Sequence, residues 1–378
     1  MIICPNLSFA VLSLITVLRH ETKASRSADS MRIAFPMFTF GRTGGEKIIS
    51  KLANAACRRG HDVTLLVPET NGAHGWDTIA NIQKVSSLPV VRRLPLVKTL
   101  ARSFPLSMGL RGFDAIVANY APTCLPVKMA GGEKVKRYYL VQHDETIFFS
   151  PLSFDYWVTR LSYAAFEENR VFVVSKWLQD IVRRRGGPQP ILLSPGIDHA
   201  SFYPRNRTAH SGKHVMVLAR DEKWKGLRVF VDAMESVRKE VEDVKIIAAG
   251  RTREPLKTSC PIEYVRPSDN ELARLYSSCD AYVLPSIIEG LGAPPLEAMA
   301  CGGAVITTDC LGTRDFAVNE VNSLVVPPED SAALSQAIVR VLTDDALSRE
   351  LRKNGPGTAA PWTYERMESI FLRTLESG

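Results

Sequence analysis

Residues 31–67 read MRIAFPMFTFGRTGGEKIISKLANAACRRGHDVTLLV, and this stretch decides the fold class. The run Met31–Phe38 predicts a buried strand, and a glycine-bearing loop follows it. Apolar residues at helical spacing predict a helix over 46–59, and Gly60 is a typical stop residue. The β-branched run His61–Val67 predicts the next strand. A strand, loop, helix and strand in this order indicate a parallel, doubly wound α/β sheet.

The same alternation continues and then begins again after a linker. The segment 186–213 is rich in Gly, Pro, Ser and Arg, and a new strand–helix series follows from His214. At about 150 residues per domain, 378 residues allow two or three domains. We expect an N-terminal domain over 31–195 and a C-terminal domain over 196–361, followed after a Gly/Pro break by a last helix within 362–378. Two such sheets turn the loops at their carboxyl ends toward each other, so the cleft between them is the expected site.

The first thirty residues are predicted to be an extension outside the fold. The apolar run from Ile2 to Leu18 is shorter than the about 20 residues that span a bilayer. No basic segment precedes it, as one would in a signal peptide. A membrane anchor is the alternative interpretation of residues 1–30.

Charge is divided unevenly along the chain. The net charge of +7 combines +11 over residues 1–195 with −4 over residues 196–378. The basic segments Val90–Arg111 and Arg183–Arg185 predict either an anionic-membrane contact or a solvated basic face. No nucleic-acid-binding motif accompanies the charge, so no nucleic-acid partner is expected. We predict a cytoplasmic protein, and we expect in addition a peripheral contact with the membrane.

The seven cysteines predict neither disulfides nor a zinc site. Their number is odd and no two have C-x-x-C spacing. Small apolar residues in a reducing compartment are the simplest interpretation.

The segment Glu289-Gly-Leu-Gly-Ala-Pro-Pro-Leu-Glu297 carries the strongest chemical signal. Gly290 and Gly292 allow a ligand to approach the backbone closely, and Pro294 suits the first turn of a helix. The free N–H groups before that turn could hold a phosphate at the positive end of the helix. A capped, solvated helix start is the alternative.

Two cations follow an earlier predicted strand. Arg220 comes at the end of the strand from His214, and Lys225 follows one short loop later. A guanidinium offers a bidentate fork to phosphate oxygens, and an ammonium offers a compact charge. The alternative is a pair of solvated surface cations.

These segments resemble, in order and spacing, the retaining nucleotide-sugar glycosyltransferases of family 4, group 1. The turn-rich Pro195-Gly-Ile-Asp198 with Phe202-Tyr-Pro204 also matches the family. The resemblance covers residues 31–378 and is strongest over 190–330. It implies the GT-B fold: two Rossmann-like domains that face each other across a cleft, with acceptor binding in the first and donor binding in the second. It also implies a terminal helix that crosses back to the N-terminal domain.

The resemblance implies roles for the C-terminal residues. Glu297 would bind the ribose hydroxyls of the donor nucleotide, and Glu289 would contact the donor sugar. Arg220 and Lys225 would hold the diphosphate and stabilise its charge as it leaves. The backbone would assist at Gly290, Leu291, Gly292 and Ala293.

The resemblance also implies roles in the N-terminal domain. Gly44 and Gly45 match a glycine pair near the phosphate and the acceptor. His143, which follows a predicted strand, matches a histidine that faces the donor sugar. A core or surface histidine is the alternative there, and Asp144 and Glu145 are weaker candidates.

The chain departs from the family pattern at two places, and it lacks a metal motif. Ala219, before Arg220, stands where the family often has glycine. Gly250 is followed by Arg251 and Arg253, which could touch the donor, where a second glycine is usual. The chain contains no Asp-x-Asp, so no metal is expected and no cofactor beyond the donor. Two other functions remain open: a GT-B sugar-nucleotide epimerase, and a non-catalytic nucleotide-sugar-binding protein.

Overall fold

The structure is a computed structural model that describes residues 30–68, 75–85, 98–250, 252 and 254–377. The extension predicted for residues 1–30 lies outside the described residues except for Ser30. Arg251 and Arg253 also lie outside them, as does the part of the predicted basic segment Val90–Arg111 that precedes Lys98.

A seven-stranded parallel sheet forms the N-terminal half, in the order β3-β2-β1-β4-β5-β6-β7. Its strands are β1 (Arg32–Pro36), β2 (Asp62–Pro68), β3 (Asn81–Val85), β4 (Ala115–Ala118), β5 (Lys136–Val141), β6 (Val171–Val173) and β7 (Ile191–Leu192). Its helices are α2 (Gly44–Arg58), α3 (Lys98–Gly109), α4 (Ala121–Met129), η3 (Glu145–Phe148), α5 (Phe154–Ser162) and α6 (Lys176–Arg184).

A six-stranded parallel sheet forms the C-terminal half, in the order β10-β9-β8-β11-β12-β13. Its strands are β8 (Lys213–Ala219), β9 (Val244–Gly250), β10 (Ile262–Val265), β11 (Ala281–Leu284), β12 (Val305–Thr308) and β13 (Leu324–Val326). Its helices are η4 (Lys223–Lys225), α7 (Leu227–Glu240), α8 (Asp269–Ser278), α9 (Ala293–Ala300), η5 (Gly312–Asp315), α10 (Ser331–Thr343) and α11 (Asp345–Ala359). Both sheets have the doubly wound order, as predicted.

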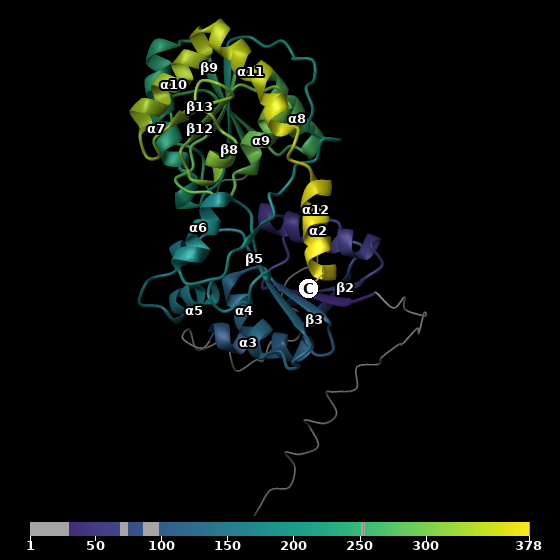
Figure 1. Cartoon of the computed structure of the whole chain (residues 1–378). Coiled ribbons are helices and arrows are strands. Elements are labelled where there is room, and N and C mark those ends of the chain that lie inside the picture. Colours follow the sequence, from purple (N-terminus) through teal and green to yellow (C-terminus); the bar gives the residue numbers. More distant parts are fainter. Residues whose placement is uncertain (1–29, 69–74, 86–97, 251, 253, 378) are drawn as a thin grey trace, which may run out of the picture.

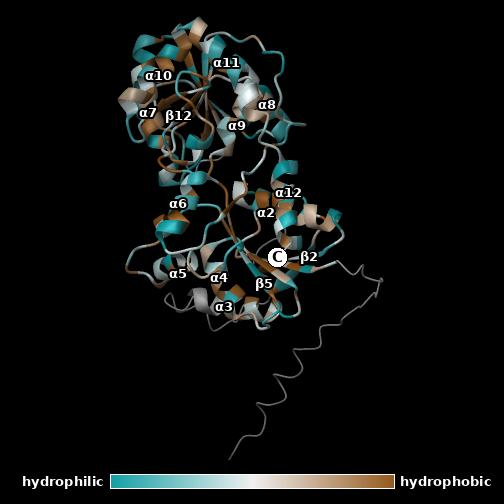
Figure 2. Ribbon diagram, in the orientation of Figure 1, coloured by the Kyte–Doolittle hydropathy of each residue, from teal (hydrophilic) through white to brown (hydrophobic). Residues whose placement is uncertain are grey.

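Alternation along the strands sends side chains to two separate cores in the C-terminal half. Val215 and Val217 of β8 pack with α7 and α10, whereas Met216 between them belongs to the core that includes α8 and α9. This period of two is what a strand buried on both faces requires. Figure 2 shows hydrophobic strands inside and hydrophilic surfaces on the outer helices.

The last helix, α12 (Tyr364–Ser377), crosses back to the N-terminal half and lies beside α2, as predicted (Figure 1). Its Phe371 is fully buried against Phe35 and Phe172 of the first sheet. Beside it runs the segment between β7 and β8, in which the chain first passes from the N-terminal to the C-terminal half. There Ile197 N–H donates to Trp362 O at 3.0 Å. A Cβ on Gly196 would lie 2.0 Å from the carbonyl carbon of Thr363, so only glycine fits between the two crossings.

One predicted break is wrong. The sequence Gly355-Pro-Gly357, expected to interrupt the chain before the last helix, lies inside α11. α11 packs on α9, and a Cβ on Gly355 would lie 3.0 Å from Met299 O. Close helix packing therefore overrides the local helix-breaking tendency of these residues.

Candidate functional site

The loops that carry the predicted site residues flank the points at which the strand order reverses. In the C-terminal sheet this point lies between β8 and β11, and in the N-terminal sheet it lies between β1 and β4. Arg220 follows β8, and the loop of Glu289 follows β11. Gly44 and Gly45 come after β1. Ligands of doubly wound sheets bind at such reversal points, so the topology alone favours these loops as the site.

Gly290 lies at a close contact between the two halves. Its carbonyl oxygen accepts hydrogen bonds from Ser175 Oγ at 2.6 Å and from Trp177 Nε1 at 2.9 Å. A Cβ on Gly290 would lie 2.0 Å from Gln142 O, so the two backbones touch. Gly290 was predicted to let a ligand approach closely, and the structure shows that it lets the two domains approach closely.

Glu289 and Lys225 form an ion pair beside this contact. Lys225 Nζ lies 2.8 and 3.0 Å from the two carboxylate oxygens of Glu289, and Ser286 Oγ donates to Oε1 at 2.7 Å. Glu289 is only 8% exposed. A buried carboxylate needs such partners to remain charged, and here they also fix the ammonium in place.

The Lys225 loop is itself held in place by its backbone. Gly226 has a φ of +66°, and a Cβ there would lie 1.9 Å from Pro285 O. Ile287 N–H donates to Trp224 O at 2.7 Å. These contacts join the two loops that carry Lys225 and Glu289, one after β8 and one after β11.

His143 faces the ion pair from the N-terminal half. Burial lowers the pKa of its imidazole, while the charge of Glu289 opposes this shift. Its Nδ1 atom lies 3.3 Å from Asp144 O, and a carbonyl can only accept, so Nδ1 carries the proton. Nε2 then offers a lone pair, and it is buried with no partner among the described residues.

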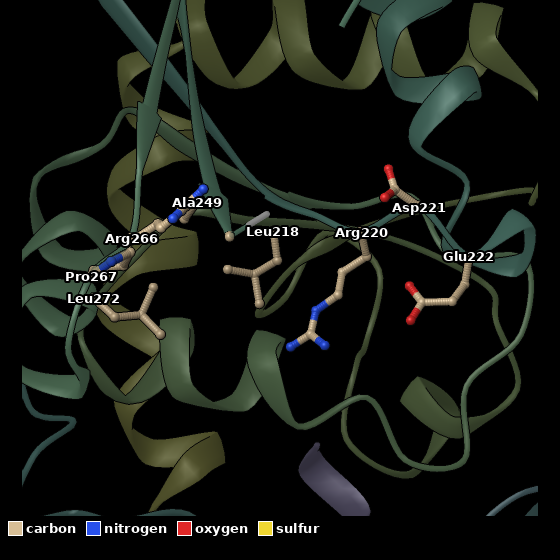
Figure 3. Close-up of a pocket in the computed structure, with 9 residues that line it drawn as sticks. Leu218, Arg220, Asp221, Glu222, Ala249, Arg266, Pro267 and Leu272 are labelled. Carbon is tan, nitrogen blue, oxygen red and sulfur yellow. The ribbon is translucent and has the colours of Figure 1, made fainter. Parts of the chain in front are cut away.

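Arg220 points into a pocket of about 590 Å³ in the C-terminal half (Figure 3). Its guanidinium is exposed and makes no hydrogen bond with the described residues. The pocket is lined by Leu218, Arg220, Asp221, Glu222, Ala249, Gly250, Arg266, Pro267 and Leu272. Its volume suits a small-molecule ligand. Of the predicted site residues, Arg220 lines it, and Glu289, Lys225 and His143 do not.

The Glu289 loop leads directly into α9, the helix that carries Glu297. α9 begins after Gly292, whose φ is +82°, and the N–H groups of Leu291, Gly292 and Ala293 bond to no described residue. Burial raises the pKa of Glu297 to about 7, and the charge of Lys47 opposes this shift. Without a ligand, this carboxyl group therefore keeps its proton to a higher pH than an exposed glutamate does.

The two glycines at the start of α2, Gly44 and Gly45, differ in their surroundings. A Cβ on Gly45 would lie 3.0 Å from Gln142 Oε1, whereas a Cβ on Gly44 would meet no described atom within 4 Å. Gln142 Oε1 is buried with no partner among the described residues. Gly45 is therefore placed near His143, and Gly44 is open at the start of α2.

The carboxylates of the two weaker candidates are engaged by other residues. Asp144 bonds with Arg185, and Glu145 accepts a hydrogen bond from Ala121 N–H. Burial raises the pKa of Glu145 to about 8.

Several contact residues were not predicted from the sequence. Ser286 holds Glu289, Ser175 and Trp177 hold Gly290, and Lys47 of α2 forms an ion pair with Asp269 at 3.2 Å. Each contact except that of Ser286 joins distant parts of the chain, and no local pattern marks them.

Comparison with known proteins supports the resemblance to the family 4 glycosyltransferases. The chain matches the family models described as Glycosyltransferase Family 4, over residues 42–201, and Glycosyl transferases group 1, over residues 203–358. An N,N'-diacetylbacillosaminyl-diphospho-undecaprenol alpha-1,3-N-acetylgalactosaminyltransferase from Campylobacter jejuni is 26% identical over 204 residues, 49% of this chain and 54% of that protein. A phosphatidyl-myo-inositol mannosyltransferase from Mycobacterium leprae is 31% identical over 184 residues, 46% of this chain and 48% of that protein.

These alignments span about half the length of each of the two relatives. A solved structure covers more of the chain: Anabaena HepE in complex with UDP-glucose has a TM-score of 0.72 at 18% identity, over 92% of this chain and 100% of HepE. At this identity the likeness is one of fold. With two family models that together match most of its length, the chain belongs to the group 1, family 4 glycosyltransferases, and its fold is GT-B.

Proposed function

We propose that this protein is a retaining glycosyltransferase that moves a sugar from a nucleoside diphosphate sugar to an acceptor hydroxyl. The observation that carries the proposal is the buried Glu289–Lys225 ion pair beside His143, at the contact between the two domains. Arg220, on the loop that also carries Lys225, extends into the adjoining pocket. The family membership and the UDP-glucose complex of HepE support a nucleotide-sugar donor.

The leaving diphosphate is stabilised by charged and polar groups that, apart from the exposed Arg220 side chain, are held in place before the reaction begins. Arg220 and Lys225 provide the cations, and the free N–H groups of residues 291–293 provide further donors at the positive end of α9. Groups that are already oriented need no reorganisation as charge develops on the phosphate. Glu297 accepts hydrogen bonds from the ribose hydroxyls.

Glu289 positions Lys225 and stabilises positive charge on the sugar, but it is not a nucleophile. Both of its oxygens already accept hydrogen bonds. The bond from the anomeric carbon to the diphosphate breaks with its electron pair on the phosphate. The acceptor oxygen bonds to the same face of the sugar, and the departing phosphate takes its proton.

Two unpaired acceptor atoms suit the hydroxyl groups of the donor sugar. His143 Nε2 and Gln142 Oε1 are both buried without a donor among the described residues. A buried acceptor without a hydrogen bond destabilises the folded protein, and a sugar hydroxyl can donate the missing hydrogen bond. Binding of a hydroxyl-rich ligand thus removes a cost present in the free protein.

The acceptor is proposed to be a glycan or a lipid-linked molecule bound by the N-terminal domain. The names of the two relatives contain a diphospho-undecaprenol and a phosphatidyl-myo-inositol, which are both lipids. We accordingly place the reaction in the synthesis of cell-surface polysaccharide, lipopolysaccharide or glycolipid, at the cytoplasmic face of a membrane.

The proposal is tested by incubating the purified protein with a panel of UDP-, GDP- and dTDP-sugars and lipid-linked acceptors, with and without EDTA. A matching donor is expected to raise Tm, because a ligand bound only to the folded state stabilises it by mass action. Transfer is expected to survive EDTA, since fixed cations and N–H groups replace a metal. NMR of the product is expected to show the anomeric configuration of the donor.

Three results would contradict parts of this proposal. Inversion at the anomeric carbon would exclude retention. Loss of activity in EDTA with recovery on adding Mn²⁺ would exclude metal independence. A donor that raises Tm but is neither transferred nor hydrolysed with any acceptor would favour the non-catalytic alternative.

We further propose that the N-terminal domain contacts an anionic membrane through α5. Phe154, Trp157 and Leu161 are exposed at helical spacing on one face of α5, and Leu152 before it is 96% exposed. Aromatic and aliphatic side chains of this kind insert at membrane interfaces. None of the helices in the described ranges is long and apolar enough to span a membrane.

The predicted basic patch needs one correction. Arg183 and Arg184 are exposed on α6, but Arg185 is turned inward to Asp144 and is not available to a membrane. The exposed pair is engaged with Asp180 on the same helix.

Vesicle flotation tests the membrane contact. The protein is expected to float with vesicles that contain anionic lipid, and the double change Trp157→Ser with Leu161→Ser is expected to weaken binding at least about tenfold. The matched control changes Val318 and Val321, two exposed apolar residues of the C-terminal domain, to Ser. Equal flotation of both double variants would exclude α5 as the contact.

A further inference from the structure

Asp144, the residue after His143, forms a bidentate ion pair with Arg185. Arg185 caps the end of α6, and its Nη1 and Nη2 atoms donate to Asp144 Oδ1 and Oδ2 at 2.9 and 2.8 Å. The side chains of Arg185 and Asp144 are only 15% and 10% exposed. A planar fork on a carboxylate, shielded from water, fixes the orientation of both groups far better than a surface ion pair does.

Further bonds hold Asp144 from its own loop. Its Oδ1 atom accepts from Thr146 N–H at 3.2 Å and from the Thr146 hydroxyl at 2.6 Å. The Arg185 guanidinium lies 4.8 Å from the ring centre of Tyr163, whose hydroxyl accepts from Glu145 N–H at 3.2 Å. The backbone of residues 144–146 is therefore fixed from both sides.

This anchored backbone selects the state of the His143 ring. Asp144 O is the atom that accepts from His143 Nδ1, at 3.3 Å. The partner of one ring nitrogen determines which nitrogen carries the proton, and so leaves Nε2 as the acceptor. Displacing the Asp144 carbonyl would release both the tautomer and the orientation of the ring.

The helix that carries Arg185 also makes the contact between the domains. At its start, Lys176 N–H donates to Asp315 Oδ2 at 2.9 Å, and Ser175 and Trp177 bond to Gly290 O. The other end bears Arg185. One helix of nine residues thus connects the C-terminal domain to the backbone that orients His143.

We propose that Arg185 is a positioning residue: through its ion pair with Asp144 it fixes the tautomer and orientation of His143 relative to the Gly290 contact. The inference rests on the proposed function, in which His143 Nε2 accepts from the donor sugar. Arg185 itself does not reach the sugar, so its loss is expected to reduce kcat more than it raises the donor KM.

The test compares Arg185→Met, Arg185→Lys and Asp144→Asn in the full chain. Arg185→Met is expected to lower kcat about 10- to 100-fold with a small change in donor KM, because a small misplacement of a positioned group costs this much. Arg185→Lys, which restores the charge but not the fork, is expected to recover part of the loss. Nitrogen-15 NMR of histidine, assigned by comparison with His143→Gln, is expected to show one Nδ1–H tautomer in the wild type and a mixture in Arg185→Met.

The control is Arg340→Met, which removes an exposed ion pair between Arg340 on α10 and Glu320. It is expected to retain the wild-type kcat and the single tautomer. If Arg185→Met fails to fold, Arg185→Lys carries the test. Wild-type kcat and a single tautomer in the folded variant would overturn the inference. If the wild type transfers no sugar, the proposed function fails, and the NMR comparison still decides whether Arg185 sets the tautomer.

Discussion

Lys225→Ala is expected to lower kcat about 100- to 1,000-fold while the protein remains folded. The ammonium is fixed 2.8 Å from Glu289 and is proposed to face the phosphate from which the sugar departs. Its loss removes a charge that is worth most when the leaving group carries its developing negative charge. The measurement is steady-state transfer at saturating donor, together with Tm.

Glu289→Ala is expected to cause a loss of the same order, because it removes the carboxylate and also frees the Lys225 side chain. Lys223→Ala is the matched control, since Lys223 is an exposed lysine in the same η4 turn. It is expected to retain turnover. Near-normal turnover in both Lys225→Ala and Glu289→Ala would refute the assignment of this site.

Gly290→Ala is expected to lower kcat/KM by about 100-fold or more, because the new methyl group separates the two domains. A Cβ at this position would lie 2.0 Å from the Gln142 carbonyl oxygen, which precedes His143. The Gln142 carbonyl group cannot move far enough to make room unless the whole loop that carries His143 moves with it. The bonds from Ser175 and Trp177 to the Gly290 carbonyl would then weaken as well. Transfer kinetics and Tm measure the effect.

Gly357→Ala is the matched control for this substitution. Gly357 lies in α11, and a Cβ there would meet no described atom within 4 Å. Alanine at this helical position is expected to raise the free energy of unfolding by about 0.5–1 kcal/mol, because it has fewer conformations than glycine in the unfolded chain. Gly290→Ala with wild-type kcat/KM would show that the domain contact is not required for transfer.

Local sequence patterns predicted the strands better than they predicted the contacts. The runs Met31–Phe38 and His61–Val67 were predicted as strands and match β1 and β2 to within two residues at each end, because short apolar runs of this kind are typical of buried strands. β3 was missed, since four of its five residues are exposed and no apolar run marks them. The Gly355–Gly357 segment was misread because its helical state depends on packing against α9.

The loops of the candidate site were predicted from motif spacing, but their mutual geometry could not be. Glu289 and Lys225 are 64 residues apart, and nothing local to either one indicates their ion pair. Arg185 was grouped with Arg183 and Arg184 as a basic run. Its true partner, Asp144, is 41 residues away and becomes adjacent only when the loop after β5 meets the end of α6 in the folded chain.

The position of α12 has a consequence for synthesis on the ribosome. Phe371 covers the face of the first sheet that carries Phe35 and Phe172, yet it follows the entire C-terminal domain in the chain. Domains usually fold in the order in which they emerge, but here the part of the N-terminal sheet around Phe35 and Phe172 lacks its contact with Phe371 until residues 364–377 have been made. During translation this sheet is therefore exposed to aggregation or to chaperone binding, and its folding is completed last.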